Sequence, residues 1–331
     1  MQQPKWRKLL QKSARDPQQL LADLDMDADR LRLSGRATDN FPLRVPDGFL
    51  GRIRHGDMHD PLLRQVLPLA EEDEVTPGYT NDPLREHASQ PVPGLLHKYH
   101  GRALLLVTGA CAIHCRYCFR RHFPYADSNP APHQWRQALA YLKHDADITE
   151  IILSGGDPLT VANNRLGLLI GELSAIAHLK RLRIHTRVPI VLPERLDDGL
   201  LSILAGTRLQ PVMVVHANHP NELDASVACG IAKMRDIRII LMNQSVLLKD
   251  INDSAAVLQE LSEKLFSIGI IPYYLHMLDP VQGAAHFAVT EEKAMKLLEH
   301  LRSTLPGYLV PRLVREIPGH TNKVSVETIC D

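Results

Sequence analysis

The chain has 331 residues, 44% of them hydrophobic and 23% charged, and its 38 Lys and Arg residues balance 38 Asp and Glu residues. The balanced charge argues against a nucleic-acid-binding or membrane-surface protein, and no apolar run approaches the roughly 18 residues of a membrane span. The polar, basic N-terminal sequence lacks the apolar stretch of a secretory signal, so we expect a soluble enzyme of the reducing cytoplasm.

Residues 1–95 are rich in Pro, Asp and Arg. They contain short helical patterns at 6–13 and 17–24, the second with Asp16 as its N-cap, and a non-helical connector at 77–94. We therefore expect an N-terminal helical and irregular region over 1–95. The main domain is expected to cover 96–290, and a short C-terminal segment 291–331.

After residue 95, short apolar strands alternate with amphipathic helical segments, a pattern typical of parallel βα units. The predicted strands are 102–108, 150–154, 181–186, 212–217, 237–242 and 273–278; the predicted helices are 134–143, 165–177, 194–204, 222–234 and 254–268. Six units predict an α/β fold with an incomplete (βα)6 barrel, open on one side. Catalytic residues of such barrels lie in the loops at the carboxyl ends of the strands.

Cys111, Cys115 and Cys118 follow the first predicted strand with the spacing Cys-x3-Cys-x2-Cys. Three thiolates from one loop suit a [4Fe-4S] cluster, with one iron left open for another ligand. A zinc site completed by His114 or His122 remains an alternative. Disulfides are disfavoured, because the five cysteines are an odd number and no secretory signal is seen.

The second predicted strand ends in Ser-Gly-Gly-Asp-Pro-Leu at 154–159. The cysteine triplet, this glycine motif and the partial barrel together resemble the radical S-adenosylmethionine (radical SAM) superfamily. The resemblance implies that Gly155, Gly156 and Asp157 hold the amino group of the methionine moiety. Further residues after the strands are expected to contact S-adenosylmethionine or a second cofactor: Arg187, His216, Asn243 and Gln244. A buried, satisfied core histidine is the alternative for His216.

Several blocks between residues 75 and 325 resemble the lysine 2,3-aminomutases. Segments 92–99, 115–125 and 272–287 are most similar to the short bacterial branch of that family, which modifies elongation factor P. The resemblance implies pyridoxal phosphate, with Lys323 as the Schiff-base lysine, although the family's glycine run before this lysine is reduced here to Gly319. Lys98 and Arg102 are expected near the cofactor phosphate and Tyr99 against its ring. For each of these residues an ordinary surface position is the alternative.

The same resemblance assigns the substrate contacts. Arg120 would bind the α-carboxylate, since a guanidinium matches a carboxylate in two hydrogen bonds. Asp279 and Glu316 would face the ε-ammonium, although the family has Asp where this chain has Glu316, and a surface or capping carboxylate is the alternative for each.

The implied activity is conversion of L-α-lysine into (R)-β-lysine through a 5′-deoxyadenosyl radical and a pyridoxal phosphate aldimine. The β-lysine would be joined to elongation factor P by a partner lysine ligase, and an electron donor such as flavodoxin or ferredoxin would reduce the cluster. Only eight residues follow Lys323, which favours the short branch.

Four alternatives remain. A catabolic free-lysine aminomutase would share every cofactor motif. A glutamate aminomutase is disfavoured, because Asp279 and Glu316 would face a carboxylate. A radical SAM enzyme without pyridoxal phosphate and a zinc-binding module complete the set. No nucleic-acid or membrane partner is expected.

Overall fold

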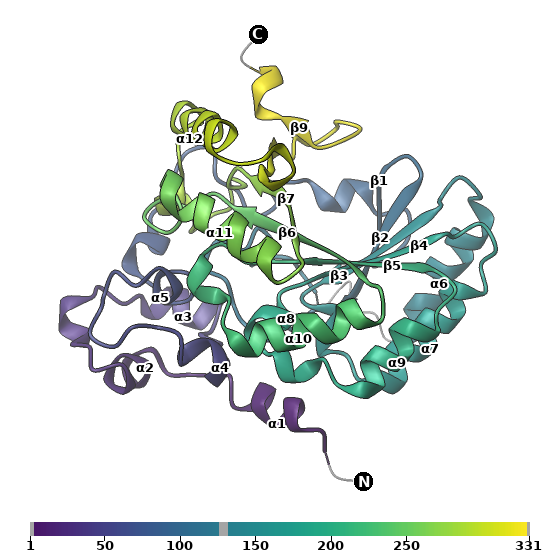
Figure 1. Ribbon diagram of the computed structural model, residues 1–331, viewed down its shortest axis with the longest axis horizontal. Helices are drawn as coiled ribbons and strands as arrows, with labels where there is room; N and C mark the ends of the chain where they lie inside the picture. Colours follow the sequence, from purple (N-terminus) through teal and green to yellow (C-terminus); the bar gives the residue numbers. More distant parts are fainter. Residues whose placement is uncertain (1–2, 126–131, 330–331) are drawn as a thin grey trace.

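The computed structural model describes residues 3–125 and 132–329. Within these ranges, nine strands form one sheet in which spatial order follows chain order. They are β1 (Leu95–Tyr99), β2 (Arg102–Thr108), β3 (Glu150–Gly155), β4 (Arg181–Thr186), β5 (Gln210–Val215), β6 (Ile240–Val246), β7 (Ile271–His276), β8 (Arg312–Arg315) and β9 (Val324–Ser325). Strands β2 to β8 are parallel, whereas β1 and β9 are antiparallel edge strands. Within the described ranges no pairing joins β1 to β9, so the sheet is an open barrel (Figure 1).

Helices lie on the outside of the sheet, in the connections between parallel strands (Figure 1). The main ones are α6 (Pro132–His144), α7 (Asn163–Ser174), α9 (Asp198–Gly206), α10 (Ala225–Asp236), α11 (Ala255–Ser267) and α12 (Glu291–Thr304), with the short α8 (Val188–Val191) after β4. Side chains of Asp197, Asp224, Ser254 and Thr290 cap α9 to α12 by accepting a backbone N–H from the first turn. The predicted partial barrel of six βα units is thus confirmed.

Some boundaries differ from the prediction. Strands β2 and β4 have the predicted bounds, but β6 begins at Ile240 rather than at residue 237. Arg238 adopts a left-handed backbone conformation, with φ of 61°, in the turn after α10, and an extended strand cannot begin there. Helix α12 and strands β1, β8 and β9 were not predicted.

The described part of the N-terminal region, 3–95, contains five short helices: α1 (Lys5–Gln11), α2 (Pro17–Asp23), α3 (Gly35–Asn40), α4 (Asp47–Leu50) and α5 (Pro61–Arg64). The predicted cap of α2 is confirmed, because the Asp16 carboxylate accepts the Gln19 N–H at 2.9 Å. The connector at 77–94 contains a single 3-10 turn, Glu86–Ser89. The other 3-10 helices are Ala28–Arg30, Ala70–Asp73, Pro158–Thr160, Pro193–Arg195, Pro220–Glu222, Ala285–Phe287, Gly307–Leu309 and Val326–Ile329.

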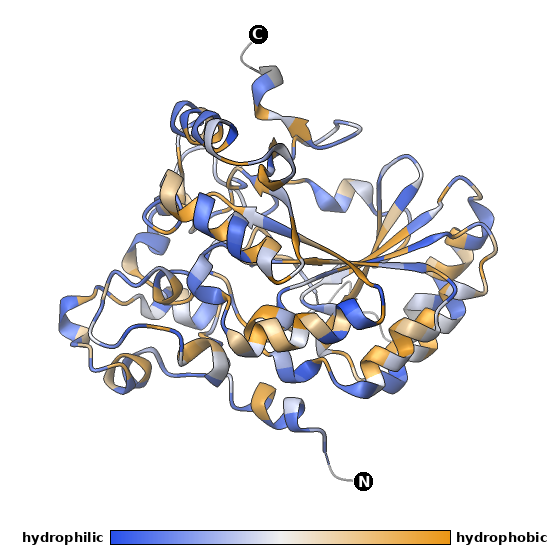
Figure 2. Cartoon of the chain, viewed as in Figure 1, coloured by the Kyte–Doolittle hydropathy of each residue, from blue (hydrophilic) through white to orange (hydrophobic). Residues whose placement is uncertain are grey.

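One hydrophobic core joins the N-terminal region to the barrel. Phe49 and Leu62 pack in the same buried cluster as Leu105 and Leu153 on the strands, whereas a second cluster joins α11 and α12 to β7 and β8. Apolar residues follow the strands and the inner helix faces, and polar residues face outward (Figure 2). Residue 95 does coincide with the start of β1, yet the segment before it shares the barrel's core. None of the helices described is long and apolar enough to cross a membrane.

Candidate active site

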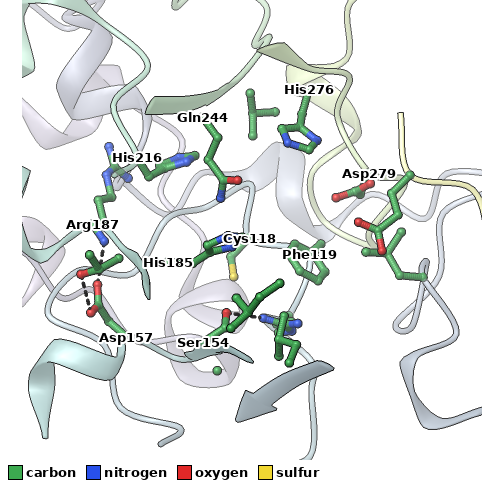
Figure 3. Close-up of a pocket in the computed structure, with 18 of the residues that line it drawn as sticks. Cys118, Phe119, Ser154, Asp157, His185, Arg187, His216, Gln244, His276 and Asp279 are labelled. Atoms are coloured by element: carbon green, nitrogen blue, oxygen red, sulfur yellow. Dashed lines mark hydrogen bonds between the residues drawn. The ribbon is translucent and has the colours of Figure 1, made fainter. Parts of the chain in front are cut away.

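A cavity of about 290 Å³ lies inside the barrel, lined by residues from Phe41 in the N-terminal region to Lys323 just before β9. It contains all the predicted site residues except Asn243: Lys98, Tyr99, Arg102, Cys111, Cys115, Cys118, Arg120, Gly155, Gly156, Asp157, Arg187, His216, Gln244, Asp279, Glu316 and Lys323. Several of them point into a common space in Figure 3. Residues far apart in the sequence thus share one cavity.

The cysteine loop follows β2 and is held by the N-terminal region. The backbone N–H groups of His114 and Arg116 donate to the carbonyls of Arg44 and Gln65 at 3.0 and 2.9 Å. Arg116 is fully buried and its guanidinium donates to both carboxylate oxygens of Glu72. The conformation of the loop therefore depends on residues 37–72.

The three thiols lie close enough to influence one another. Burial and the neighbouring thiols raise the pKa of Cys118 to about 11, and the same causes raise the pKa of Cys111. A cationic metal centre reverses this effect, since a thiol that coordinates a metal is deprotonated. In residues 3–125 and 132–329, no three His, Cys, Asp or Glu side chains meet the geometry for one metal ion. A [4Fe-4S] cluster does not need that geometry, because it spreads its thiolates over several irons.

Gly155 and Gly156 allow the loop after β3 to touch the cysteine loop. A Cβ on Gly155 would lie 2.5 Å from the Thr108 carbonyl oxygen, and one on Gly156 would lie 2.4 Å from that of Ala110. The Gly156 and Asp157 N–H groups donate to those two oxygens at 2.7 and 2.8 Å. These glycines thus have a packing role; their contact with S-adenosylmethionine stays a prediction.

Asp157 joins the same loop to β4. Its carboxylate accepts hydrogen bonds from the Thr186 hydroxyl at 2.7 Å and from the backbone N–H groups of Leu159, Arg187 and Val188. Through these four hydrogen bonds, Asp157 holds the loop after β3 against the end of β4 and the residues that follow it.

Arg187 contacts the cysteine loop directly. Its Nη1 lies 2.7 Å from the Cys115 Sγ and 2.8 Å from the Tyr117 hydroxyl, while its Nη2 donates to Gln65 and Glu222. Its Nε is buried and has no partner in the described part of the chain. An unpaired buried donor in the cavity wall fits a site that accommodates a polar ligand.

Burial lowers the pKa of the three histidines that line the cavity. Burial, with Arg187 as a further cause, lowers the pKa of His216 to about 3, and its Nε2 lies 2.8 Å from the Tyr117 hydroxyl. Burial likewise lowers the pKa of His185 and His276. The Nε2 of His185 is buried without a partner among the described residues.

Gln244 and Asn243 differ in position. Gln244 lines the cavity and points into it (Figure 3). Asn243 does not line it, because its amide exchanges hydrogen bonds with the backbone of Ala217 and donates to the Ser245 hydroxyl. These bonds fasten the loop after β5 to β6; a contact of Asn243 with a cofactor stays a prediction.

At the other end of the cavity, Lys323 lies beside Glu316. Its Nζ donates to Glu316 Oε2 at 2.8 Å, and Lys98 donates to Oε1 of the same carboxylate at 2.9 Å. Burial opposes ionisation of Glu316, but the two ammonium groups outweigh it and hold its pKa well below the usual range. The side chain of Lys323 is 21% exposed and lines the cavity, so it is not a free surface lysine.

Asp279 lies near this group without an ion pair to it. Burial and the negative charge of Glu316 raise the pKa of Asp279 to about 7. The carboxyl group points into the cavity (Figure 3). A cationic ligand end beside it would favour its ionised form.

Basic groups at this end fit a phosphate. Arg102 lines the cavity and lies over the Tyr99 ring, with its Cζ 4.6 Å from the ring centroid. Arg102 has no ion pair among the described residues, because Glu150, which lies opposite it in the sheet, pairs with other arginines. Together with the amine of Lys323, this set fits pyridoxal phosphate.

Sequence reasoning missed several lining residues. His185 and Arg183 occupy alternate positions of β4, a signal that strand periodicity could have provided. His276 ends β7 and could have been found in the same way. Glu86 lies in the connector before β1, and no motif marks it.

Comparisons with known proteins agree with this site. Residues 105–222 match the family model described as "Radical SAM superfamily". The "L-lysine 2,3-aminomutase" of Escherichia coli (strain K12) is 49% identical over 313 residues, which are 94% of this chain and 91% of that protein. The protein of the same name from Haemophilus influenzae is 48% identical, over 96% of this chain and 94% of its own.

More distant proteins match a smaller share of their own length. The "L-lysine 2,3-aminomutase" of Clostridium subterminale is 36% identical over 84% of this chain and 67% of that protein. A radical SAM methyltransferase of known structure from Sphaerobacter thermophilus is 18% identical, with a TM-score of 0.42 over 67% of this chain and 68% of that one, too distant a likeness to add to these findings.

Proposed function

This chain belongs to the L-lysine 2,3-aminomutase family of radical SAM enzymes, and from that premise we propose that it converts L-α-lysine into (R)-β-lysine with the help of pyridoxal phosphate. One observation carries the proposal most directly. The three cysteines of the cluster motif and the Lys323 amine line the same cavity, and Asp279 and Glu316 lie at the lysine end.

Membership of the radical SAM superfamily implies a [4Fe-4S] cluster and S-adenosylmethionine. Together these groups, when bound, supply a 5′-deoxyadenosyl radical. Cys111, Cys115 and Cys118 would hold the cluster, and His216 and Gln244 line the space beside it. The barrel walls keep water away from the reacting atoms.

Pyridoxal phosphate, when bound, supplies a carbonyl carbon that reacts with an amine and a π-system that stabilises an adjacent radical. Lys323 would attach the cofactor through its amine. Arg102 would neutralise part of the phosphate charge, and the Tyr99 ring lies directly below that guanidinium.

The charges of the cavity match the two ends of lysine. Arg120 offers N–H donors for the α-carboxylate, and Asp279 and Glu316 offer carboxylates for the ε-ammonium. A glutamate side chain would bring a third carboxylate to these two acids, which like-charge repulsion disfavours.

The physiological role is proposed from the blocks at 92–99, 115–125 and 272–287, which resemble the branch that modifies elongation factor P. A lysine ligase would transfer the β-lysine to that factor, and flavodoxin or ferredoxin would supply the electron in the cytoplasm. The intact mass of elongation factor P, compared between cells with and without this protein, tests the role. An unchanged mass would favour a catabolic use of β-lysine.

The activity itself is tested anaerobically. The reconstituted protein is incubated with dithionite, S-adenosylmethionine, pyridoxal phosphate and L-α-lysine, and the product is separated by chiral chromatography. We expect (R)-β-lysine from the wild type and none from Lys323→Ala. Lys323→Ala should also lose the near-visible absorption that borohydride removes. Cleavage of S-adenosylmethionine without β-lysine would contradict the proposed substrate and leave the radical chemistry standing.

A further inference from the structure

Glu86 is a buried carboxylate in the wall of the cavity. It begins the 3-10 turn Glu86–Ser89 just before β1, only 3% of the residue is exposed, and its backbone N–H donates to the Asp82 carboxylate at 3.0 Å. No element of the proposed chemistry uses it. A buried carboxylate must be paired to remain stable, and its partners show what it does.

Glu86 binds Arg120 through two parallel hydrogen bonds. Arg120 Nε lies 2.7 Å from Glu86 Oε2, and Arg120 Nη2 lies 2.8 Å from Oε1. Arg120 Nη1 donates to the Ser154 hydroxyl oxygen at 3.1 Å, the bond that ends on Ser154 in Figure 3. A guanidinium has five N–H donors. These bonds use three of them and leave one hydrogen on Nη1 and one on Nη2.

The charges along this wall alternate in sign. Glu86 also lies 3.4 Å from the Lys98 ammonium, which in turn binds Glu316, and Glu316 binds Lys323. Burial opposes ionisation of Glu86, but Arg120 and Lys98 outweigh it and lower its pKa. Glu86 thus lies between the Arg120 guanidinium and the Lys98 ammonium and binds both of them.

We infer that Glu86 is a positioning residue for recognition of the substrate's α-carboxylate. By occupying the Nε and Nη2 side of Arg120, it fixes the plane of the guanidinium and leaves the Nη1 and Nη2 hydrogens for a carboxylate, so the enzyme selects α-amino acids whose carboxylate is free. This inference rests on the role proposed above for Arg120 and assigns its orientation to a residue outside every recognised motif.

Binding of L-lysine and L-lysinamide to the pyridoxal phosphate-loaded enzyme tests the inference. The amide lacks the negative carboxylate, and binding is followed by the absorbance change of the cofactor, without turnover. In Glu86→Gln we expect the Kd for lysine to rise about tenfold, the effect of weakening one charged hydrogen-bonded contact. The Kd for lysinamide should change by less than about twofold, because that ligand presents no carboxylate.

Glu150→Gln is the matched control. Glu150 is also buried and binds Arg181 and Arg183, but it does not line the cavity. It should leave the ratio of the two Kd values unchanged. If Glu86→Gln does not fold, Glu86→Asp serves instead, because it keeps the charge but moves it by about one methylene; it should reduce the preference for lysine by a smaller factor.

The outcomes separate this inference from the proposed function. Equal affinity of the wild type for both ligands would refute the carboxylate role of Arg120. A wild type that prefers lysine, with that preference intact in Glu86→Gln or Glu86→Asp, would overturn the role of Glu86 alone. An equal rise of both Kd values in Glu86→Gln would also overturn it, because loss of a residue with a purely structural role would weaken the binding of both ligands alike. Tighter lysine binding in Glu86→Gln would show that Glu86 competes with the substrate for Arg120.

Discussion

At the scale of single residues, Asp279 predicts how activity depends on pH. Burial and Glu316 raise its pKa to about 7, and in the proposed function only its ionised form would attract the distal ammonium of lysine. Below that pH the carboxylate is protonated, so kcat/KM should fall about tenfold per pH unit. The measurement is a profile of kcat/KM from about pH 5.5 to about pH 8.5.

Asp279→Asn provides the comparison. It should lower kcat/KM roughly tenfold to a hundredfold at neutral pH, the cost of losing a hydrogen bond between charged groups, and its profile should lack the acidic limb near pH 7. A variant that keeps the limb would assign it to another group.

We predict that Arg187 influences the reduction potential of the cluster. Its Nη1 lies 2.7 Å from the Cys115 Sγ, and hydrogen bonds to ligand sulfurs raise the reduction potential of such clusters. Arg187→Lys keeps a positive charge near Glu222 but cannot reach all the partners of the guanidinium fork. We expect the potential of the reconstituted cluster to become more negative by tens of millivolts, measured by a redox titration. An unchanged potential would show that this bond does not influence the bound cluster.

At the scale of elements, the contact between the loop after β3 and the cysteine loop is predicted to control cluster loading. A methyl group at residue 156 would lie 2.4 Å from the Ala110 carbonyl oxygen, so one of the two loops must move. Gly156→Ala should destabilise the fold by roughly 1–3 kcal/mol and lower the iron and sulfide content after anaerobic reconstitution. Iron content and thermal unfolding are the two measurements.

Gly171→Ala is the control for this substitution. Gly171 lies in α7, and a Cβ there meets nothing within 4 Å. Alanine favours a helix over glycine by up to about 1 kcal/mol, so this variant should be at least as stable as the wild type and bind as much iron. If Gly171→Ala lost as much stability and iron as Gly156→Ala, the contact between the two loops would not be what controls cluster loading.

The strands differ in how well they could be predicted from the sequence. Strands β2 and β4 are continuous or alternating apolar runs that read directly as strands. Strand β8 has four residues and β9 only two. Such segments bury too little surface to show a pattern, and their strand conformation depends on the neighbours they pair with. The residues of the site also differ in this respect. The cysteine triplet could be predicted because its spacing is fixed in the sequence. Glu86 could not, because only the folding of the chain brings it to Arg120.

At the scale of the whole molecule, side chains join the two edges of the open sheet. Glu316, just after β8, binds Lys98 on β1 and Lys323 before β9. Glu316→Gln removes both ion pairs. Backbone amides of β8 and β9 should then exchange with deuterium about tenfold faster, whereas those of β3 should be unchanged.

Glu292→Gln is suited as the control for hydrogen exchange. Glu292 pairs with Lys296 on the exposed face of α12, where a surface pair contributes little. It should leave exchange in β8 and β9 at the wild-type rate. Protection that is equal in Glu316→Gln and the wild type would mean that packing alone holds the last strands.

The agreement between strand order and chain order has a consequence for synthesis of the protein. Of the residues that line the cavity, Lys323 is the last in the chain, so a ribosome has made the cysteine loop and the rest of the wall before this lysine is added. A product terminated early would carry the cysteines for iron and sulfide but would lack Lys323, the amine proposed above to attach pyridoxal phosphate. Under that proposal, attachment of the cofactor would distinguish a completed barrel from a truncated one.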